Sequence, residues 1–217
     1  MLMVVDCCLA VLVGYLLGSI PTGYLAGRLK ENIDIREHGS RSTGATNVLR
    51  TLGPSAAIIV LCVDFLKGFA AVLIADRMSP LLLSIWESAQ PTATDANVLI
   101  ALAGSAALLG HSRSIWLKFS GGKSAATGLG VLCAMSIPIG LGTAFAFVIT
   151  LFAFRIVSLS SLVAALAAVV LVNAFAEPLP FRILVVLGAT YVFVLHRMNI
   201  HRMLNGLEPR IGRRTFE

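Results

Sequence analysis

The sequence predicts an all-α, polytopic membrane helical bundle, and three observations lead to that prediction. Of the 217 residues, 57% are hydrophobic and only 13% are charged, whereas soluble domains usually carry about 25% charged residues. The mean hydropathy is +0.88. The apolar residues also form runs that approach the roughly 20 residues a helix needs to cross a bilayer. We therefore expect one integral membrane domain over residues 1–217.

Seven apolar segments follow one another along the chain. We expect membrane helices at residues 4–29, 56–75, 97–109, 124–135, 139–154, 159–175 and 181–195. The fourth segment is short, and Pro138 separates it from the fifth because proline breaks or kinks a helix interior. The alternative is one kinked helix over 125–154, which would place the C-terminus on the opposite side of the membrane.

The basic residues favour seven spans. With the N-terminus outside, the segments that face the cytoplasm are 28–53, 110–123, Arg155 and 196–217. They hold fourteen of the 17 Lys and Arg residues, leaving out Lys67, Arg77 and Arg182. Cytoplasmic loops of membrane proteins are enriched in such residues, so we expect a cytoplasmic C-terminus. This distribution explains the net charge of +6 without a nucleic-acid partner, and none is expected.

The sequence predicts no cleaved signal peptide, disulfide framework, metal site or cofactor. Asp6 is the only charged residue among the first twenty, so the first span lacks the basic region of a cleaved signal peptide. The four cysteines lie in apolar runs and form no CxxC pair, which indicates neither a disulfide framework nor a zinc site. The sequence shows no cluster of Asp, Glu and His that could bind a metal, and no cofactor is expected.

The segment 39–53, GSRSTGATNVLRTLG, is polar, Gly-rich and cationic, and it lies between two long apolar runs. Glycines, hydroxyls and an Arg fork are suited to wrapping a phosphate. The alternative is a solvated loop in which Thr46 or Asn47 caps the next helix. The candidate residues of this segment are Ser40, Gly44, Thr46, Asn47 and Arg50.

A second candidate anion site precedes the fourth span. Gly121 and Gly122 would let the backbone close on an anion at a helix N-terminus, and Lys123 adds a full charge. This is not a nucleotide P-loop, because Leu117 stands where that motif needs glycine. The alternative for Lys123 is a positive-inside anchor.

Polar residues also occur in the second span and after the last one. Asp64 and Lys67 lie three residues apart on one helix face, where they could neutralise each other or contact a substrate. Charges inside a span are expensive and mostly functional. His196 and Asn199 share one side of the segment that follows the last span, and a His at this rim could transfer a proton or bind a phosphate.

Taken together, these motifs resemble those of one family. The segments GSRSTGATNVLRTLG, VDFLKG with SGGKSAATGLGV, HRMNIHRMLNGLEPRIG and GSIPTGYLAGRL look like the signatures of the bacterial acyl-phosphate:glycerol-3-phosphate acyltransferase (PlsY) family. The resemblance implies a seven-span enzyme of the bacterial inner membrane with a cytoplasmic active site. It would transfer an acyl group from acyl phosphate to the 1-hydroxyl of glycerol 3-phosphate, giving lysophosphatidic acid and phosphate for phospholipid biosynthesis. Its partners would be these substrates, the lipid bilayer and the enzyme that forms the acyl phosphate.

The resemblance also implies roles for residues at matching motif positions. The catalytic positions are those of Ser40, Arg50, Lys123 and His196. The substrate-binding positions are those of Gly44, Thr46, Asn47, Gly121, Gly122 and Asn199. Asp64 and Lys67 match a pair of the family whose role we leave open.

Some positions depart from the family pattern. Arg41 and Ser42 stand where Gly and Asn are usual, and Ser124 replaces a Gly after Lys123. Ser114 and Met198 stand where Pro and Glu are usual. We expect Arg41 to matter most, because it removes backbone freedom from the proposed phosphate loop.

Three alternative functions compete with this interpretation. A transporter or channel for a phosphorylated metabolite could use the intramembrane charges, but transporters often contain inverted repeats and this chain shows none. An acyl-CoA acyltransferase with His and Asp five positions apart is not expected, because none of the four His residues has an Asp at that spacing. A non-catalytic member of the family remains the third.

Overall fold

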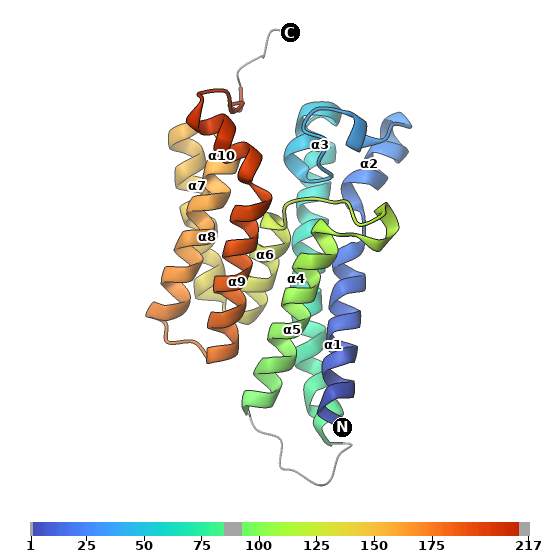
Figure 1. Cartoon of the computed structure of the whole chain (residues 1–217), viewed down its shortest axis with the longest axis vertical. Coiled ribbons are helices and arrows are strands. Elements are labelled where there is room, and N and C mark those ends of the chain that lie inside the picture. Colours follow the sequence, from blue (N-terminus) through green and yellow to red (C-terminus); the bar gives the residue numbers. More distant parts are fainter. Residues whose placement is uncertain (1, 85–92, 213–217) are drawn as a thin grey trace.

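Within residues 2–84 and 93–212, which the computed structural model describes, the chain is almost entirely helical (Figure 1). An isolated bridge between Ser114 and Ser120 is its one β feature in that part. The longer helices are α1 (Leu2–Ser19), α4 (Pro54–Ser84), α5 (Ala93–Ser112), α7 (Ile137–Phe154), α8 (Val157–Ala174) and α9 (Leu179–Leu195). The shorter helices are α2 (Thr22–Glu31), α3 (Ala45–Leu52), α6 (Ala125–Met135) and α10 (Arg197–Leu204), with the 3₁₀ turns η1 (Ile35–Glu37) and η2 (Ile115–Leu117).

The first predicted span is broken near its end. α1 stops at Ser19, and α2 starts after Pro21, which has no N–H to continue the hydrogen-bond ladder. The polar second half of α2 then leaves the apolar run. The break exposes the carbonyl of Ile20, which accepts a hydrogen bond from Lys67 Nζ at 3.0 Å.

The fourth and fifth predicted segments are two helices and not one kinked helix. Ser136 is extended (φ −156°, ψ 108°), and it separates α6 from α7. Pro138 lies in the first turn of α7, where its missing N–H costs no intrahelical bond. The prediction of a division around Pro138 is therefore correct, although the break itself is at Ser136.

The prediction of an all-α membrane bundle is confirmed at this level of detail. Five helices of the described chain are long and apolar enough to cross a membrane, or six if the bent pair α9 and α10 counts as one span. α6 has only 11 residues and occupies part of the bundle's height (Figure 1). The count of seven spans and the orientation of the termini stay predictions. Residues 85–92, between the second and third predicted spans, and the basic Arg213 and Arg214 lie outside the described residues.

The helices form two groups, α1 to α5 and α7 to α10, with α6 packed between α4 and α7 (Figure 1). Close approach of backbones holds the first group together. A Cβ at Gly14 or Gly18 of α1 would overlap backbone atoms of Ala103 or Ala107 in α5. Small residues four apart are typical of tightly packed membrane helices. In Figure 1, α2, α3 and α10 lie at the same end of the bundle, opposite the start of α1.

Candidate active site

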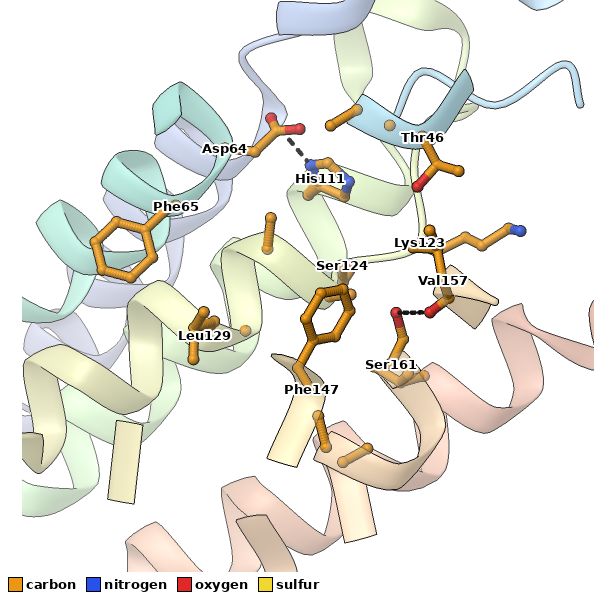
Figure 2. Close-up of a pocket in the computed structure, with 18 of the residues that line it drawn as sticks. Thr46, Asp64, Phe65, His111, Lys123, Ser124, Leu129, Phe147, Val157 and Ser161 are labelled. Carbon is orange, nitrogen blue, oxygen red and sulfur yellow. Dashed lines mark hydrogen bonds and ion pairs between the residues drawn. The ribbon is translucent and has the colours of Figure 1, made fainter. Parts of the chain in front are cut away.

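A cavity of about 680 Å³ lies between the two helix groups and joins polar and apolar surroundings. Its polar part is lined mainly from three regions: the start of α3 with the loop before it, the turn before α6, and α10 with the residue that follows α9. Its apolar part is lined by side chains of α4, α6, α7, α8 and α9, such as Leu129 and Phe147 (Figure 2). A ligand with an anionic head and an apolar tail would match both parts.

The loop before α3 is held by Asn47. Its Oδ1 accepts a hydrogen bond from Ser40 N at 2.8 Å, and its Nδ2 lies 2.9–3.1 Å from the carbonyl oxygens of Ile35, His38 and Ser42. Asn47 is buried and is not among the residues that line the cavity. It organises the loop, while other predicted residues of this segment face the cavity: Ser40, Gly44, Thr46 and Arg50.

Two of the departures from the family pattern lie at glycine-like backbone positions. Arg41 has φ 59° and Ser124 has φ 60°, in the left-handed region that non-glycine residues adopt at a cost. Arg41 is exposed and its N–H donates to His38 O at 3.0 Å. Ser124 is buried and its hydroxyl donates to Leu108 O at 2.7 Å. Both loops therefore make a left-handed turn at a residue that is not glycine.

Two helix N-termini meet at the cavity. Gly44 caps α3 and Ser124 caps α6, and neither helix has a side-chain hydrogen bond to its first turn. Ala45, Thr46, Ala125 and Ala126 all line the cavity. The first N–H groups of a helix have no intrahelical partner, and together with the helix dipole they attract anions. The arrangement can therefore bind negatively charged groups at two places.

Two cationic side chains reinforce this character. Lys123 lines the cavity beside Thr46 (Figure 2), and its Nζ donates to Asn199 Oδ1 at 2.6 Å. Burial lowers the pKa of Lys123 to about 8. Arg50 also lines the cavity, and within the described part of the chain it makes no hydrogen bond or ion pair. Partial burial lowers the pKa of Arg50, but a guanidinium stays protonated in proteins.

A buried hydrogen-bond network lies behind Lys123. Asn199 Nδ2 donates to Glu208 Oε1 at 2.6 Å, and Arg202 Nε donates to Glu208 Oε2 at 2.7 Å. Ser158 Oγ of α8 also donates to Oε1 at 2.8 Å. Burial alone would raise the pKa of Glu208, but these three hydrogen bonds together hold it below its ordinary value. The carboxylate is thus charged and fixes α10 against α8.

His196 follows α9 directly, outside that span, and lines the cavity. Its Nδ1 lies 2.8 Å from the carbonyl oxygen of Val192. A carbonyl can only accept, so Nδ1 carries a proton and Nε2 of the neutral ring is left as an acceptor. Burial lowers the pKa of His196 to about 4. The ring is therefore neutral at physiological pH and can accept a hydrogen bond from a ligand hydroxyl.

Asp64 and Lys67 form a buried ion pair at 2.8 Å. Asp64 lines the cavity and also accepts a hydrogen bond from Thr22 Oγ1. Lys67 is turned away to the carbonyl of Ile20 and is not a lining residue. The two side chains thus neutralise each other and join α4 to the break between α1 and α2, which is the first of the two alternatives for this pair. Of the two residues, Asp64 also faces the cavity.

The structure brings together eight of the candidate site residues, and they line one cavity: Ser40, Gly44, Thr46, Arg50, Asp64, Lys123, His196 and Asn199. Gly121 and Gly122 pack instead against the backbone and ring of His111. Sequence reasoning missed Glu208, His111 and Ser158, which also line the cavity. The one available signal for Glu208 was an isolated acidic residue in a strongly basic tail.

The fold and the site define a class: an integral membrane protein whose helices enclose a cavity with cationic side chains and helix N-termini in one part and an apolar lining in the other. Comparison with known proteins makes this specific. A family model described as "Glycerol-3-phosphate acyltransferase" matches residues 8–206. The chain belongs to the glycerol-3-phosphate acyltransferase family.

Curated relatives agree over nearly the whole length. Glycerol-3-phosphate acyltransferase 2 of Rhizobium johnstonii is 52% identical over 205 residues, which cover 93% of this chain and 94% of the relative. Glycerol-3-phosphate acyltransferases of Synechococcus sp. and Synechocystis sp. are 51% and 50% identical, covering 95% and 96% of this chain and 95% and 92% of the relatives.

Solved structures share the fold. The crystal structure of PlsY (YgiH), described as an integral membrane glycerol 3-phosphate acyltransferase in its glycerol 3-phosphate form, matches with a TM-score of 0.83 and 33% identity. The match covers 95% of this chain and 96% of that chain. A second structure, described as the lysophosphatidic acid form, matches with a TM-score of 0.81, 32% identity and 95% coverage of both chains.

Proposed function

We propose that this protein transfers an acyl group from acyl phosphate to the 1-hydroxyl of glycerol 3-phosphate. The products would be lysophosphatidic acid and inorganic phosphate, an early step of phospholipid biosynthesis. The observation that supports this most is the single cavity in which Lys123, Arg50 and two uncapped helix N-termini lie beside an apolar interior. Both substrates carry a phosphate, and one also carries an acyl chain.

The chemistry needs little from the protein beyond placement, because acyl phosphate is already activated. The glycerol oxygen attacks the acyl carbon and forms the new C–O bond, while the bond from the acyl carbon to the phosphate oxygen breaks. Lys123, Arg50 and the helix N-termini hold the two phosphates and stabilise the charge on the leaving group. Holding two reactants in the reactive geometry alone accelerates such reactions strongly.

The proton of the attacking hydroxyl has two candidate acceptors. His196 Nε2 is free to accept a hydrogen bond and can orient the hydroxyl, but the pKa of His196 is only about 4. Phosphate groups have a second pKa of about 6, and the departing phosphate gains negative charge as its bond to the acyl carbon breaks, so it is the stronger base. We assign the orienting role to His196 and the final proton acceptance to the departing phosphate.

The proposal extends to the setting of the enzyme. We place it in the bacterial inner membrane with seven crossings, in which α6 is a short span shielded by its neighbours. The end that carries α2, α3 and α10 would face the cytoplasm, because the basic residues concentrate there. The enzyme that forms acyl phosphate would then be a partner on that side. The whole chain, 1–217, would be one domain.

The proposal is tested with purified protein in lipid vesicles and labelled glycerol 3-phosphate. Acyl phosphate, acyl-CoA and acyl carrier protein are offered separately as donors. We expect labelled lysophosphatidic acid with acyl phosphate alone. Lys123→Ala and Arg50→Ala should abolish transfer while the protein stays inserted and monodisperse. Transfer from acyl-CoA alone, or near-wild-type rates in both variants, would overturn the proposed donor or the proposed site.

A further inference from the structure

His111, in the last turn of α5, lies between the buried Asp64 and the turn that presents Lys123 (Figure 2). On one side, Nδ1 of the ring is 3.5 Å from Asp64 Oδ1. On the other side, the ring edge at Nε2 fills the space beside Gly122, where a Cβ would overlap Nε2. The ring is buried, so it has little freedom to move away from either neighbour.

The backbone of His111 contacts the same turn. Gly122 N–H donates to His111 O at 3.0 Å. A Cβ at Gly121 would overlap that same carbonyl oxygen. Neither glycine has a positive φ in the described structure, so close approach to His111, and not backbone conformation, is what calls for glycine at both positions. The side chain excludes a Cβ at 122 and the backbone excludes one at 121.

The ion pair behind His111 fixes the position of Asp64. Asp64 Oδ1 receives Lys67 Nζ at 2.8 Å and the hydroxyl of Thr22. The Asp64 and Lys67 side chains are 1% and 3% exposed. Separating such a pair would leave an uncompensated buried charge, which is strongly unfavourable. Asp64 is therefore held in place, and its carboxylate lies opposite Nδ1 of the His111 ring at a distance longer than a typical hydrogen bond.

We propose that His111, anchored by Asp64, is a positioning residue that sets the path of Gly121 to Lys123 and hence the place of the Lys123 ammonium. The inference rests on the proposed function, in which that turn binds a substrate phosphate. It gives Asp64 and Lys67 a role through His111, without direct contact between Lys67 and substrate. A displacement of this turn by a fraction of an ångström would misplace the cation and the N–H groups of the α6 N-terminus.

The role of His111 can be tested because its side chain excludes a Cβ at position 122, whereas its backbone excludes one at position 121. Gly122→Ala should raise KM for one of the phosphate substrates by about 10- to 100-fold, with a smaller change in kcat, because the added methyl pushes the turn away from His111. His111→Asn keeps an N–H donor near the Nδ1 position and removes the ring edge at Nε2. The double variant His111→Asn/Gly122→Ala should therefore recover at least about tenfold in kcat/KM over Gly122→Ala, a gain that kinetics resolves easily.

The matched control is His111→Asn/Gly121→Ala. It should show no recovery over Gly121→Ala, because the Cβ at 121 meets the backbone carbonyl of residue 111, which the substitution keeps. His111→Gln/Gly122→Ala is a second control, because the Gln amide reaches the space of Nε2 and keeps the clash. Equal recovery at 121 and 122, or none at 122, would overturn the proposal. If His111→Asn does not yield folded protein, His111→Ser gives the same comparison without the ring.

The outcome is separable from the fate of the proposed function. If the wild-type protein were inactive with every acyl donor, the proposed acyltransferase function would be refuted. The variants could still be compared by their binding of glycerol 3-phosphate and of inorganic phosphate, measured as the shift that each ligand causes in the thermal unfolding midpoint. The same pattern, with loss in Gly122→Ala and recovery in the double variant, is expected in that measurement. No difference in binding among the variants would again refute the positioning role.

Discussion

Lys123 and Glu208 share one side-chain amide. Lys123 Nζ donates to Asn199 Oδ1 and Asn199 Nδ2 donates to Glu208 Oε1, both at 2.6 Å. An ammonium can only donate and a carboxylate can only accept, so the two charges leave a single orientation for the amide. Asn199 therefore transmits the position of Glu208, which is fixed against α8 by Ser158, to the cation in the cavity.

Glu208→Gln should weaken both the fold and the site. The amide keeps the size of the side chain but loses the negative charge that accepts hydrogen bonds from three donors. Hydrogen bonds to charged groups are worth about 1.5–3 kcal/mol each in stability. We expect a loss of at least about 1.5 kcal/mol, and a lower kcat/KM because Asn199 is no longer held. Thermal unfolding in detergent and transfer kinetics measure the two effects.

Glu31→Gln is the matched control, because Glu31 ends α2 and is exposed. Exposed substitutions away from specific contacts change stability by about 0.5 kcal/mol or less. Equal unfolding midpoints and equal rates for the two variants would contradict the role given to Glu208.

The rate of transfer should fall at alkaline pH. Burial lowers the pKa of Lys123 to about 8, and a Lys is charged below its pKa. The cation is thus largely present at pH 7 and is lost as pH rises through about 8. In Lys123→Arg the charge persists at all accessible pH values, so the variant, though slower because it lacks the Lys geometry, should lose this decline. The pH dependence of kcat/KM from pH 6 to 10 measures both; an unchanged alkaline decline in Lys123→Arg would assign it to another group.

The helices could be predicted from the apolar runs, because in a membrane protein hydropathy alone marks the buried segments. Predicted boundaries such as 159–175 and 181–195 lie within a few residues of α8 and α9. The break after α1 was not predicted, although Pro21 gave a local signal for it. Whether α6 crosses the membrane depends on the neighbours that shield it, which no single segment of sequence reveals.

The site could be predicted where the chemistry is local. Lys123 and Arg50 are cations beside glycines or hydroxyls, and their motifs place them in the polar segments that meet at the cavity. Glu208 and His111 escaped prediction because their roles come from contacts between distant segments. Glu208 meets Ser158 of α8, and His111 meets Asp64 of α4; pairings of this kind require the packing of the helices.

Replacing Arg41 and Ser124, the two left-handed residues that depart from the family pattern, with glycine should change the stability of the protein in different ways. Arg41→Gly removes a left-handed non-glycine residue, which costs about 1–2 kcal/mol, and loses no side-chain hydrogen bond or ion pair in the described structure. The greater freedom of glycine in the unfolded chain offsets part of this gain. We expect a net stabilisation of up to about 1 kcal/mol, visible as a higher unfolding midpoint.

Ser124→Gly should give no such gain. Its left-handed strain also disappears, but so does the buried hydrogen bond from Ser124 Oγ to Leu108 O, worth about 0.5–1.5 kcal/mol. Ser124→Ala, which keeps the strain and loses the bond, should be the least stable of the three variants. A lower midpoint for Arg41→Gly than for wild type would show that the Arg41 side chain makes a favourable interaction that outweighs the backbone strain.

Neighbouring residues of the first loop should separate stability from activity. Asn47→Ala removes the acceptor for Ser40 N and the donors to the carbonyls of Ile35, His38 and Ser42. Because unsatisfied buried groups cost about 1–3 kcal/mol, we expect a large drop in the unfolding midpoint together with loss of transfer.

Thr46→Ala should change the stability by no more than about 0.5 kcal/mol, which is typical of uninvolved sites. Thr46 lines the cavity, and its hydroxyl has no partner in the described chain. Its effect should appear in KM for a phosphate substrate. Similar midpoints for Asn47→Ala and Thr46→Ala would mean that the loop is not held by Asn47, and its shape would then need another explanation.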